Sequence, residues 1–381
     1  MGFDFSFALI GFWGAVILAG IIYRISVLTQ KRPASKQSSL WLWVRKTLIL
    51  PATFGKHQAE AVAYTYTIPT RLESIILGVY LIMNIVFCFP GYNTFIGNQY
   101  YPTVKLQLAR YVADRTGFLA IAQLPMVWIF ATRNDPFMWL TGWNFAMFNR
   151  FHRWIARISV LHAVIHSIAY TVFDFYSTPG DASTYKSSWA EEYWYCGGIA
   201  TVIMCLMLGA SAYYFRQRCY DLFLALHIGM SLIFFVTLWY HVRIFDGEFN
   251  YYLWPCIAIW GLDRLLRVGR TIFVSIMPRY TKCVQATATY HRTTEMVRMD
   301  ITDFFPQKEI VPGHYYYMYM PSGLRGYESH PMTLCSWKRP GPSLPPSPTR
   351  TPDFTKEIEA TVRRVSHDMS SSAAPELAHS F

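Results

Sequence analysis

The sequence has little charge. Only 15% of its 381 residues are Asp, Glu, Lys or Arg, whereas a soluble domain carries about 25%. Hydrophobic residues make up 53% of the chain, aromatic residues make up 17%, and the mean hydropathy is positive. This composition argues against a soluble helical protein and indicates a chain that places much of its length in lipid.

Cysteine and acidic residues are also scarce. The seven cysteines show no paired metal-ligand spacing and lie mostly in or beside apolar stretches, so they read as small buried residues rather than as a disulfide framework. Asp and Glu number 23 against 34 Lys and Arg, which gives a net charge of +11. Because the basic residues collect in loops between apolar stretches, they favour contact with anionic lipid over nucleic-acid binding.

Long apolar runs are abundant. Each is close to the length of a bilayer span once flanking residues and tilt are allowed. They cover residues 5–28, 72–90, 116–131, 151–173, 193–215, 220–240 and 251–269. The sequence therefore predicts a membrane all-α protein with seven spans, of which the third and seventh are the most polar.

The loop charges predict an orientation. Basic residues cluster after the first, third and fifth spans, whereas the segment between the fourth and fifth spans carries Asp174, Asp181, Glu191 and Glu192. Because positive loops stay in the cytoplasm, we expect the N-terminus outside and the chain after Arg270 inside. Segment 91–115 departs from this rule, since its Lys and Arg outnumber its acids.

Four histidines lie in two of the apolar stretches, His152 and His166 in one and His227 and His241 in the other. Both pairs are separated by fourteen residues, which is within roughly 40° of four full helical turns and about 21 Å along the axis. Two such helices running the same way would place His152 opposite His227 and His166 opposite His241. Polar side chains in a membrane usually serve a function, so the pattern predicts two stacked bis-histidine hemes.

Alternatives remain for these histidines. Any of them could simply hydrogen-bond a neighbouring carbonyl, and His162 with His166 has the spacing of a helical metal pair. The second stretch has Thr237 where His162 would have its counterpart, so we expect His162 to pack beside the site rather than to bind iron. No Cys-x-x-Cys-His sequence is present, so the hemes would be noncovalent.

Several motifs resemble the ferric reductase transmembrane family, the fungal metalloreductases related to NADPH oxidases. The runs Arg133-Asn134-Asp135-Pro136 and Phe151-His152-Arg153-Trp154, with 162–167, are similar to that family's first heme helix. Residues 220–242 are similar to its second, and 260–264 are similar to its last span. The resemblance covers roughly residues 115–337 and implies the same histidine pairing.

After the membrane region the pattern changes to alternation. Residues 282–290, 296–301 and 315–320 read as half-buried strands. Ser329 to Leu334 then resembles the family's His-Pro-Phe-Thr flavin motif, which implies that His330, Pro331, Met332 and Thr333 line FAD in a small antiparallel barrel. Met332 replaces the phenylalanine that is usual in this motif. The alternative is that the segment is only the end of a strand and does not bind FAD.

The family pattern stops after this motif. Residues 338–353 are rich in proline and serine, and no glycine-rich nicotinamide-binding turn follows. We expect a disordered tail over 338–381, an incomplete FAD pocket and no NADPH-binding domain. A truncated gene product and a genuine short form both fit this ending.

The domain prediction has four parts: N-terminal spans and loops (1–115), a heme-binding transmembrane domain (116–270), a partial FAD-binding β-barrel (281–337) and the tail (338–381). The resemblance implies a plasma-membrane ferric-chelate reductase for iron uptake. Electrons would pass from cytosolic NADPH through FAD and two b-type hemes to extracellular ferric or cupric ion. In a truncated chain, full activity is in doubt.

Three alternatives use many of the same residues. The first is NADPH-oxidase-like reduction of oxygen, and the second is a heme electron-transfer subunit that needs a separate reductase partner. The third is a seven-span transporter that binds an ion at His162 and His166. The four arginines Arg150, Arg153, Arg264 and Arg267 lie at the expected cytoplasmic edge, where they could pair heme propionates or only anchor the spans.

Overall fold

The structure is a computed structural model of the chain. It describes residues 2–29, 39–55, 61–62, 66–178, 181–281, 286–291, 296–301, 315–319 and 329–333. The expected tail, 338–381, lies outside these residues. The chain divides into two compact units, residues 1–267 and 268–381.

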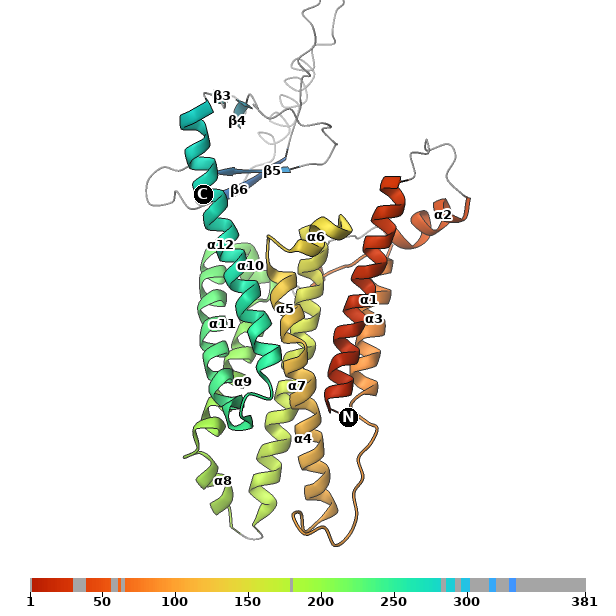
Figure 1. The fold of residues 1–381 in the computed structure, drawn as a ribbon, viewed down its shortest axis with the longest axis vertical. Helices are drawn as coiled ribbons and strands as arrows, with labels where there is room; N and C mark the ends of the chain where they lie inside the picture. Colours follow the sequence, from red (N-terminus) through yellow and green to blue (C-terminus); the bar gives the residue numbers. More distant parts are fainter. Residues whose placement is uncertain are drawn as a thin grey trace, which may run out of the picture. The chain divides into compact units, whose positions relative to one another are not determined.

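The first unit is helical (Figure 1). Its long helices are α1 (Gly2–Thr29), α3 (Arg71–Val86), α4 (Val104–Ala122), α7 (Phe145–Ser177), α9 (Glu192–Ala210), α11 (Tyr220–Val242) and α12 (Asn250–Thr281), the last of which continues into the second unit. Its short helices are α2 (Ser39–Val44), α5 (Leu124–Ala131), α6 (Pro136–Thr141), α8 (Ser183–Ser188) and α10 (Tyr213–Arg218). A π-helical turn (Arg45–Ile49), a 3-10 turn (Arg243–Phe245) and the short strands β1 (Ala61–Val62) and β2 (Tyr66–Thr67) complete it.

Local sequence signals explain where several helices begin. Thr70 and Glu73 form a reciprocal capping box at the start of α3. Asp135 caps α6 directly before Pro136, and Asn144 caps α7. The caps give the otherwise unpaired first N–H groups an acceptor, so α7 begins at a fixed residue, seven positions before His152.

The expected third span, 116–131, is two helices rather than one. Helix α4 starts earlier, at Val104, and ends at Ala122, and α5 begins at Leu124. Pro125 lacks an N–H group and cannot continue the hydrogen-bond ladder of α4. Gln123 at the junction donates to the Leu119 carbonyl and accepts from the Tyr80 hydroxyl, which stabilises the break.

Four helices among the described residues are long and apolar enough to cross a membrane: Gly2–Thr29, Phe145–Ser177, Glu192–Ala210 and Tyr220–Phe245. The other three expected spans, 72–90, 116–131 and 251–269, fall on helices that do not meet this standard. Helix α3 has only 16 residues, α4 includes Lys105, Arg110, Asp114 and Arg115, and α12 carries Asp263, Arg264 and Arg267. Four candidate spans are therefore found, and a count of seven stays a prediction.

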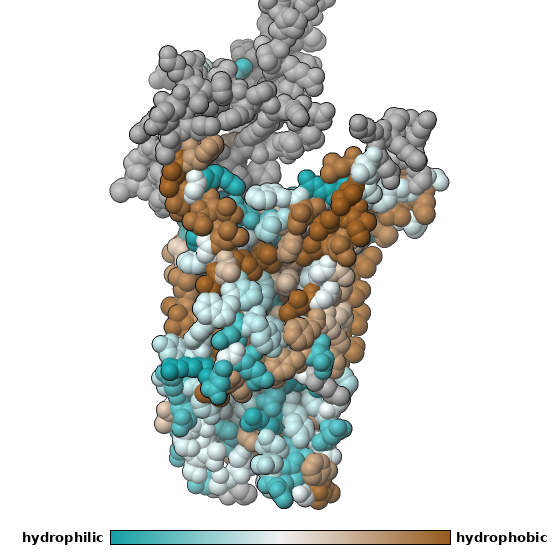
Figure 2. All heavy atoms as spheres, viewed as in Figure 1, coloured by the Kyte–Doolittle hydropathy of each residue, from teal (hydrophilic) through white to brown (hydrophobic). Residues whose placement is uncertain are grey.

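The spans pack around a partly aromatic interior. Helix α7 packs on α4, α5 and α9, α11 packs on α9, and α1 packs on α4 and α6. Trp13, Tyr80, Phe130, Phe148 and Phe151 are fully buried. In contrast, large apolar side chains such as Leu18 and Ile22 of α1 and Leu232 and Val236 of α11 are exposed. Figure 2 shows strongly apolar residues over the upper part of α1. Exposed apolar helix faces of this kind fit a lipid surround.

The second unit contains two separate antiparallel strand pairs. Strand β3 (Ala286–His291) pairs with β4 (Met296–Ile301), and β5 (Tyr315–Tyr319) pairs with β6 (Ser329–Thr333). These strands match the expected runs 282–290, 296–301 and 315–320 within a few residues. The flavin-like motif forms β6, in register so that His330 pairs with Met318 and Met332 with Tyr316. The described strands do not join into one sheet, so the barrel stays a prediction.

Candidate functional site

His152 and His227 face each other between α7 and α11. Their ring centroids lie 6.3 Å apart, and the ring planes are nearly perpendicular, at 79°. The Nδ1 atom of His152 is 2.8 Å from the Val127 carbonyl oxygen in α5. The Nδ1 atom of His227 is 3.4 Å from the Ser211 hydroxyl, which follows α9.

His166 and His241 form a second facing pair. Their ring centroids are 5.9 Å apart and the planes meet at 84°. The Nδ1 atom of His166 lies 2.8 Å from the Ala113 carbonyl oxygen in α4, and that of His241 lies 2.7 Å from the Tyr193 carbonyl oxygen in α9. The pairs follow in the same order along both helices, so α7 and α11 run in the same direction.

These contacts define which nitrogen of each ring is available. A carbonyl oxygen only accepts, so Nδ1 of His152, His166 and His241 must donate, and Nε2 keeps its lone pair. Metal–imidazole bonds of about 2.0 Å on opposite sides of one ion put the two ring centroids roughly 6 Å apart. Both pairs have this spacing.

The donor set suits a macrocycle better than a bare ion. Each site offers two imidazoles, and the described residues contain no group of three or more His, Cys, Asp or Glu that could hold a metal ion. Iron in a porphyrin already has four nitrogen ligands and needs only the two axial ones. The histidine pairs therefore fit noncovalent heme.

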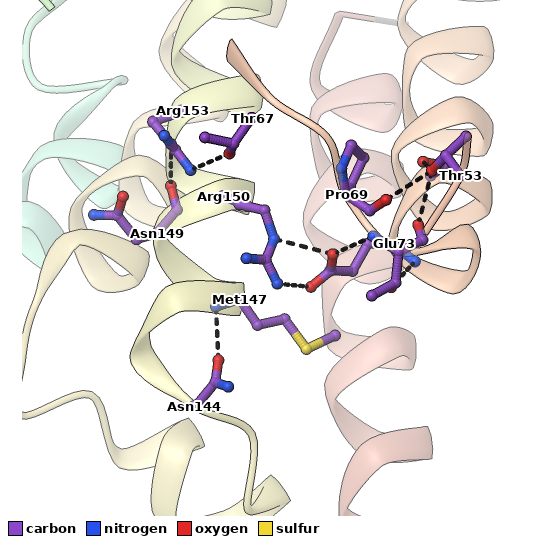
Figure 3. Close-up of polar contacts among 11 residues, drawn as sticks. Thr53, Thr67, Pro69, Glu73, Asn144, Met147, Asn149, Arg150 and Arg153 are labelled. Carbon is purple, nitrogen blue, oxygen red and sulfur yellow. Dashed lines mark hydrogen bonds and ion pairs between the residues drawn. The ribbon is translucent and has the colours of Figure 1, made fainter. Parts of the chain in front are cut away.

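Arg150 and Arg153, which flank His152 in the sequence, both form polar contacts that hold this part of α7 (Figure 3). Arg150 forms an ion pair with Glu73 of α3, in which Arg150 Nε lies 3.0 Å from one carboxylate oxygen and the second nitrogen contacts the other. Arg153 donates to the Thr67 hydroxyl at 3.2 Å and to the Asn149 carbonyl at 3.3 Å. These contacts fix the position of the His152 backbone relative to α3.

The four arginines suggested for propionate pairing are mostly engaged elsewhere. Arg150 pairs with Glu73, and Arg264 and Arg267 both lie within ion-pair distance of the buried Asp263. Of the four, Arg153 forms hydrogen bonds to neutral groups, the Asn149 carbonyl and the Thr67 hydroxyl, within the part of the chain that the structure describes. These ion pairs favour an anchoring role for Arg150, Arg264 and Arg267.

Arg216 of α10 was not singled out by the sequence for this role. It lies close enough to His152 and Arg153 for electrostatic interaction, and its Nε atom is buried with no hydrogen-bond partner among the described residues. Burial lowers the pKa of this guanidinium. Two partly buried cations beside the His152–His227 pair could bind an anionic group, such as the propionate of a heme held there.

His162 turns away from both histidine pairs. Its Nε2 atom is 3.1 Å from the Asn84 Oδ1 atom of α3, and its side chain is buried. His166, one turn later, bonds to α4 and faces α11. The two rings have different partners, so the structure does not favour a metal ion bound between His162 and His166, which their spacing suggested.

The flavin-like residues His330, Pro331, Met332 and Thr333 lie in β6, where the Met332 side chain is exposed. Their FAD-binding role stays a proposal.

Comparison with known proteins gives the family. Residues 116–238 match the family model for the ferric reductase like transmembrane component. The chain is 33% identical to ferric reductase transmembrane component 3 of Saccharomyces cerevisiae over 85% of its length, which is 44% of that protein. It is 30% identical to ferric/cupric reductase transmembrane component 1 of Candida albicans over 72% of its length, or 36% of that protein.

The chain thus spans less than half the length of these relatives. The apolar helices and the relatives agree on an integral membrane protein. With both histidine-bearing helices largely inside the matched segment, the chain belongs to the ferric reductase transmembrane family.

Proposed function

We propose that this chain conducts electrons across a membrane, from a cytosolic donor to ferric or cupric ion on the other side. One observation carries the proposal: two facing histidine pairs lie in the same order along two helices long enough to span a bilayer. The relatives named ferric and ferric/cupric reductases support the choice of acceptor.

Two b-type hemes, when bound, would supply a pair of one-electron carriers. His152 with His227 would hold one heme and His166 with His241 the other, and iron held by two imidazoles would favour outer-sphere electron transfer over binding of a gas at the metal. The Nδ1 hydrogen bonds to backbone carbonyls hold three of the four rings in the tautomer that presents Nε2.

The two ends of the site differ in charge. Arg153 and Arg216 lie near the His152 pair, whereas the charged groups near His166 are Asp114 and Arg110, which form an ion pair with each other. Under the positive-inside rule the His152–His227 pair is the cytosolic, electron-receiving one. The His166–His241 pair is then the extracellular, electron-delivering one. In the proposed orientation the N-terminus would lie outside a plasma membrane and the second unit in the cytosol. Helix α3, the α4–α5 pair and α12 would complete seven crossings.

The second unit is proposed to hold FAD through His330, Pro331, Met332 and Thr333. A nicotinamide-binding domain would deliver electrons from NADPH, in a longer form of the chain or in a reductase partner. In this proposal the residues described do not take part in hydride transfer from NADPH. They provide the path by which electrons cross the membrane.

The test begins with the full chain, purified from a host that supplies heme. Pyridine hemochrome analysis should give two hemes per chain, reducible by dithionite. His152→Ala or His227→Ala should remove one heme, and His166→Ala or His241→Ala the other, with His162→Ala as the control that keeps both. Wild-type protein without heme would end the proposal.

The acceptor is tested separately. Vesicles that contain the chain and an internal reductant should reduce an external ferric chelate, and the four histidine variants should not. Formation of superoxide without metal reduction would instead support the oxidase alternative.

A further inference from the structure

The two histidines of the second pair each lie directly against a glycine on a neighbouring helix. A Cβ atom added at Gly117 of α4 would lie 2.6 Å from Nδ1 of His166, and one at Gly197 of α9 would lie 2.5 Å from Nδ1 of His241. Real Cβ contacts essentially never fall below 3.0 Å. Neither ring could keep its position if the glycine were any other residue.

Each of these glycines follows, by four residues, the carbonyl that the same histidine contacts. His166 donates to the carbonyl of Ala113 and lies against Gly117, and His241 donates to the carbonyl of Tyr193 and lies against Gly197. In an α-helix, residues four apart lie on one face, and the carbonyl oxygen of the first points toward the second. A missing Cβ at the second residue therefore opens the first carbonyl to a side chain from another helix.

The first histidine pair lacks this arrangement. His152 contacts the Val127 carbonyl, and the residue four positions later is Ala131. His227 has a hydroxyl, Ser211, as its Nδ1 neighbour. A histidine that contacts both a carbonyl and the glycine four residues after it is thus found twice, on two different helices, and both times in the second pair.

We propose that Gly117 and Gly197 are positioning residues for the two axial ligands of the extracellular heme, an inference that rests on the proposed function. By exposing a carbonyl, each glycine fixes its imidazole with Nδ1–H as donor and Nε2 toward the iron. A hydrogen bond of this kind makes the imidazole a stronger donor, which stabilises ferric heme and lowers its midpoint potential. These residues therefore set both the ligand geometry and the potential at the electron-delivering end.

Close contact at a glycine is not by itself evidence of a ligand, since a Cβ atom at Gly20 of α1 would lie 2.7 Å from the Trp143 ring. Suitable controls are glycines of the same helices that make no contact. Gly209 lies in α9 with Gly197, and Gly229 lies in α11 with His241, yet a Cβ at either would meet nothing within 4 Å. These positions provide matched controls, because Gly209→Ala and Gly229→Ala change the same residue type in the same helices without touching the ligands.

The experiment compares Gly117→Ala, Gly197→Ala, Gly209→Ala and Gly229→Ala in the full chain, with heme stoichiometry and a potentiometric titration of the visible bands as readouts. For Gly117→Ala and Gly197→Ala we expect one of two things: a rise in the midpoint potential of one heme alone, or a fall from two hemes to one. The other heme should keep its potential and spectrum, which also shows that the variant is folded. The two controls should match wild type.

A second variant covers the case in which Gly197→Ala fails to assemble. In a His241→Ala background the ring is gone, so the added methyl group has room. The double variant should then match His241→Ala in yield, stability and remaining heme. If the double variant has the same low yield and stability as Gly197→Ala alone, Gly197 has a packing role and the proposal is overturned. The proposal is also overturned if Gly117→Ala and Gly197→Ala both keep two hemes with unchanged midpoint potentials. Loss of heme from wild type would refute the proposed function itself, which separates the two failures.

Discussion

Glu73 and Arg150 join the start of α3 to the first turns of α7 through a two-pronged ion pair in which both side chains are largely buried (Figure 3). Glu73 also accepts from the Thr70 backbone N–H in the capping box. One carboxylate therefore caps the start of α3 and aligns the turn of α7 that carries His152.

Replacing Glu73 with Gln should destabilise the protein markedly. The amide keeps a cap acceptor but leaves the Arg150 guanidinium without its counter-charge, and breaking a buried pair typically costs about 3–5 kcal/mol. Thermal unfolding in detergent should show a lower midpoint than wild type. Asp300→Asn breaks the exposed Arg298–Asp300 pair and should change little. Equal effects from both variants would contradict the proposed anchoring.

His162→Ala should retain both hemes. Its ring contacts Asn84 of α3, and its Nδ1 atom has no partner among the described residues. The variant loses a buried polar contact, so a modest fall in thermal stability is expected without change in the visible spectrum. Loss of one heme would instead assign His162 a part in ligation.

Asp263→Asn should weaken the connection between α12 and the segment before α6. Asp263 is buried, accepts from the side-chain and backbone nitrogens of Asn134, and pairs with Arg264 and Arg267. An amide leaves both guanidinium groups without a negative partner, so protease susceptibility and thermal unfolding should both worsen. Asp221→Asn is the control, since Asp221 is exposed in the first turn of α11. A wild-type melting curve for Asp263→Asn would show that this cluster contributes nothing to stability.

Asp135 should make stability depend on pH. Burial raises the pKa of this loop carboxyl from 3.8 to about 7, and its Oδ2 atom has no partner among the described residues, while Oδ1 caps α6. Between pH 4 and 7 the folded state holds a proton that the unfolded state has released, so this group's contribution to stability falls as pH rises through that window and is constant above it.

Asp135→Asn removes that titration but keeps a residue able to cap a helix. The stability of wild type relative to Asp135→Asn should therefore increase as the pH is lowered from 7.5 to 5. Melting curves for the two proteins across this range measure the difference. A difference that is constant with pH would mean that Asp135 does not titrate there.

Parts of the fold could be predicted from local signals. The runs 151–173 and 220–240 fall within α7 and α11, and alternation located the strands at 286–291, 296–301 and 315–319. The break in the run 116–131 was harder to place, because Pro125 allows either a kink or a new helix, and the Gln123 contacts with Leu119 and Tyr80 select the latter. Hydropathy gave seven runs, and among the described residues four helices are long and apolar enough to be candidate spans, so the other three spans stay a prediction.

The sequence by itself determined that His152 with His166, and His227 with His241, share a face of their helices, since fourteen residues at a constant helical rotation return to nearly the same direction. Only the tertiary structure decided which rings face each other, that His162 turns to Asn84, and that Arg216 joins Arg153 near His152. It also decided that Gly117 and Gly197 lie against His166 and His241, which come 49 and 44 residues later in the chain. Spacing within a helix follows from backbone geometry, but contacts between helices depend on packing, which no local pattern specifies.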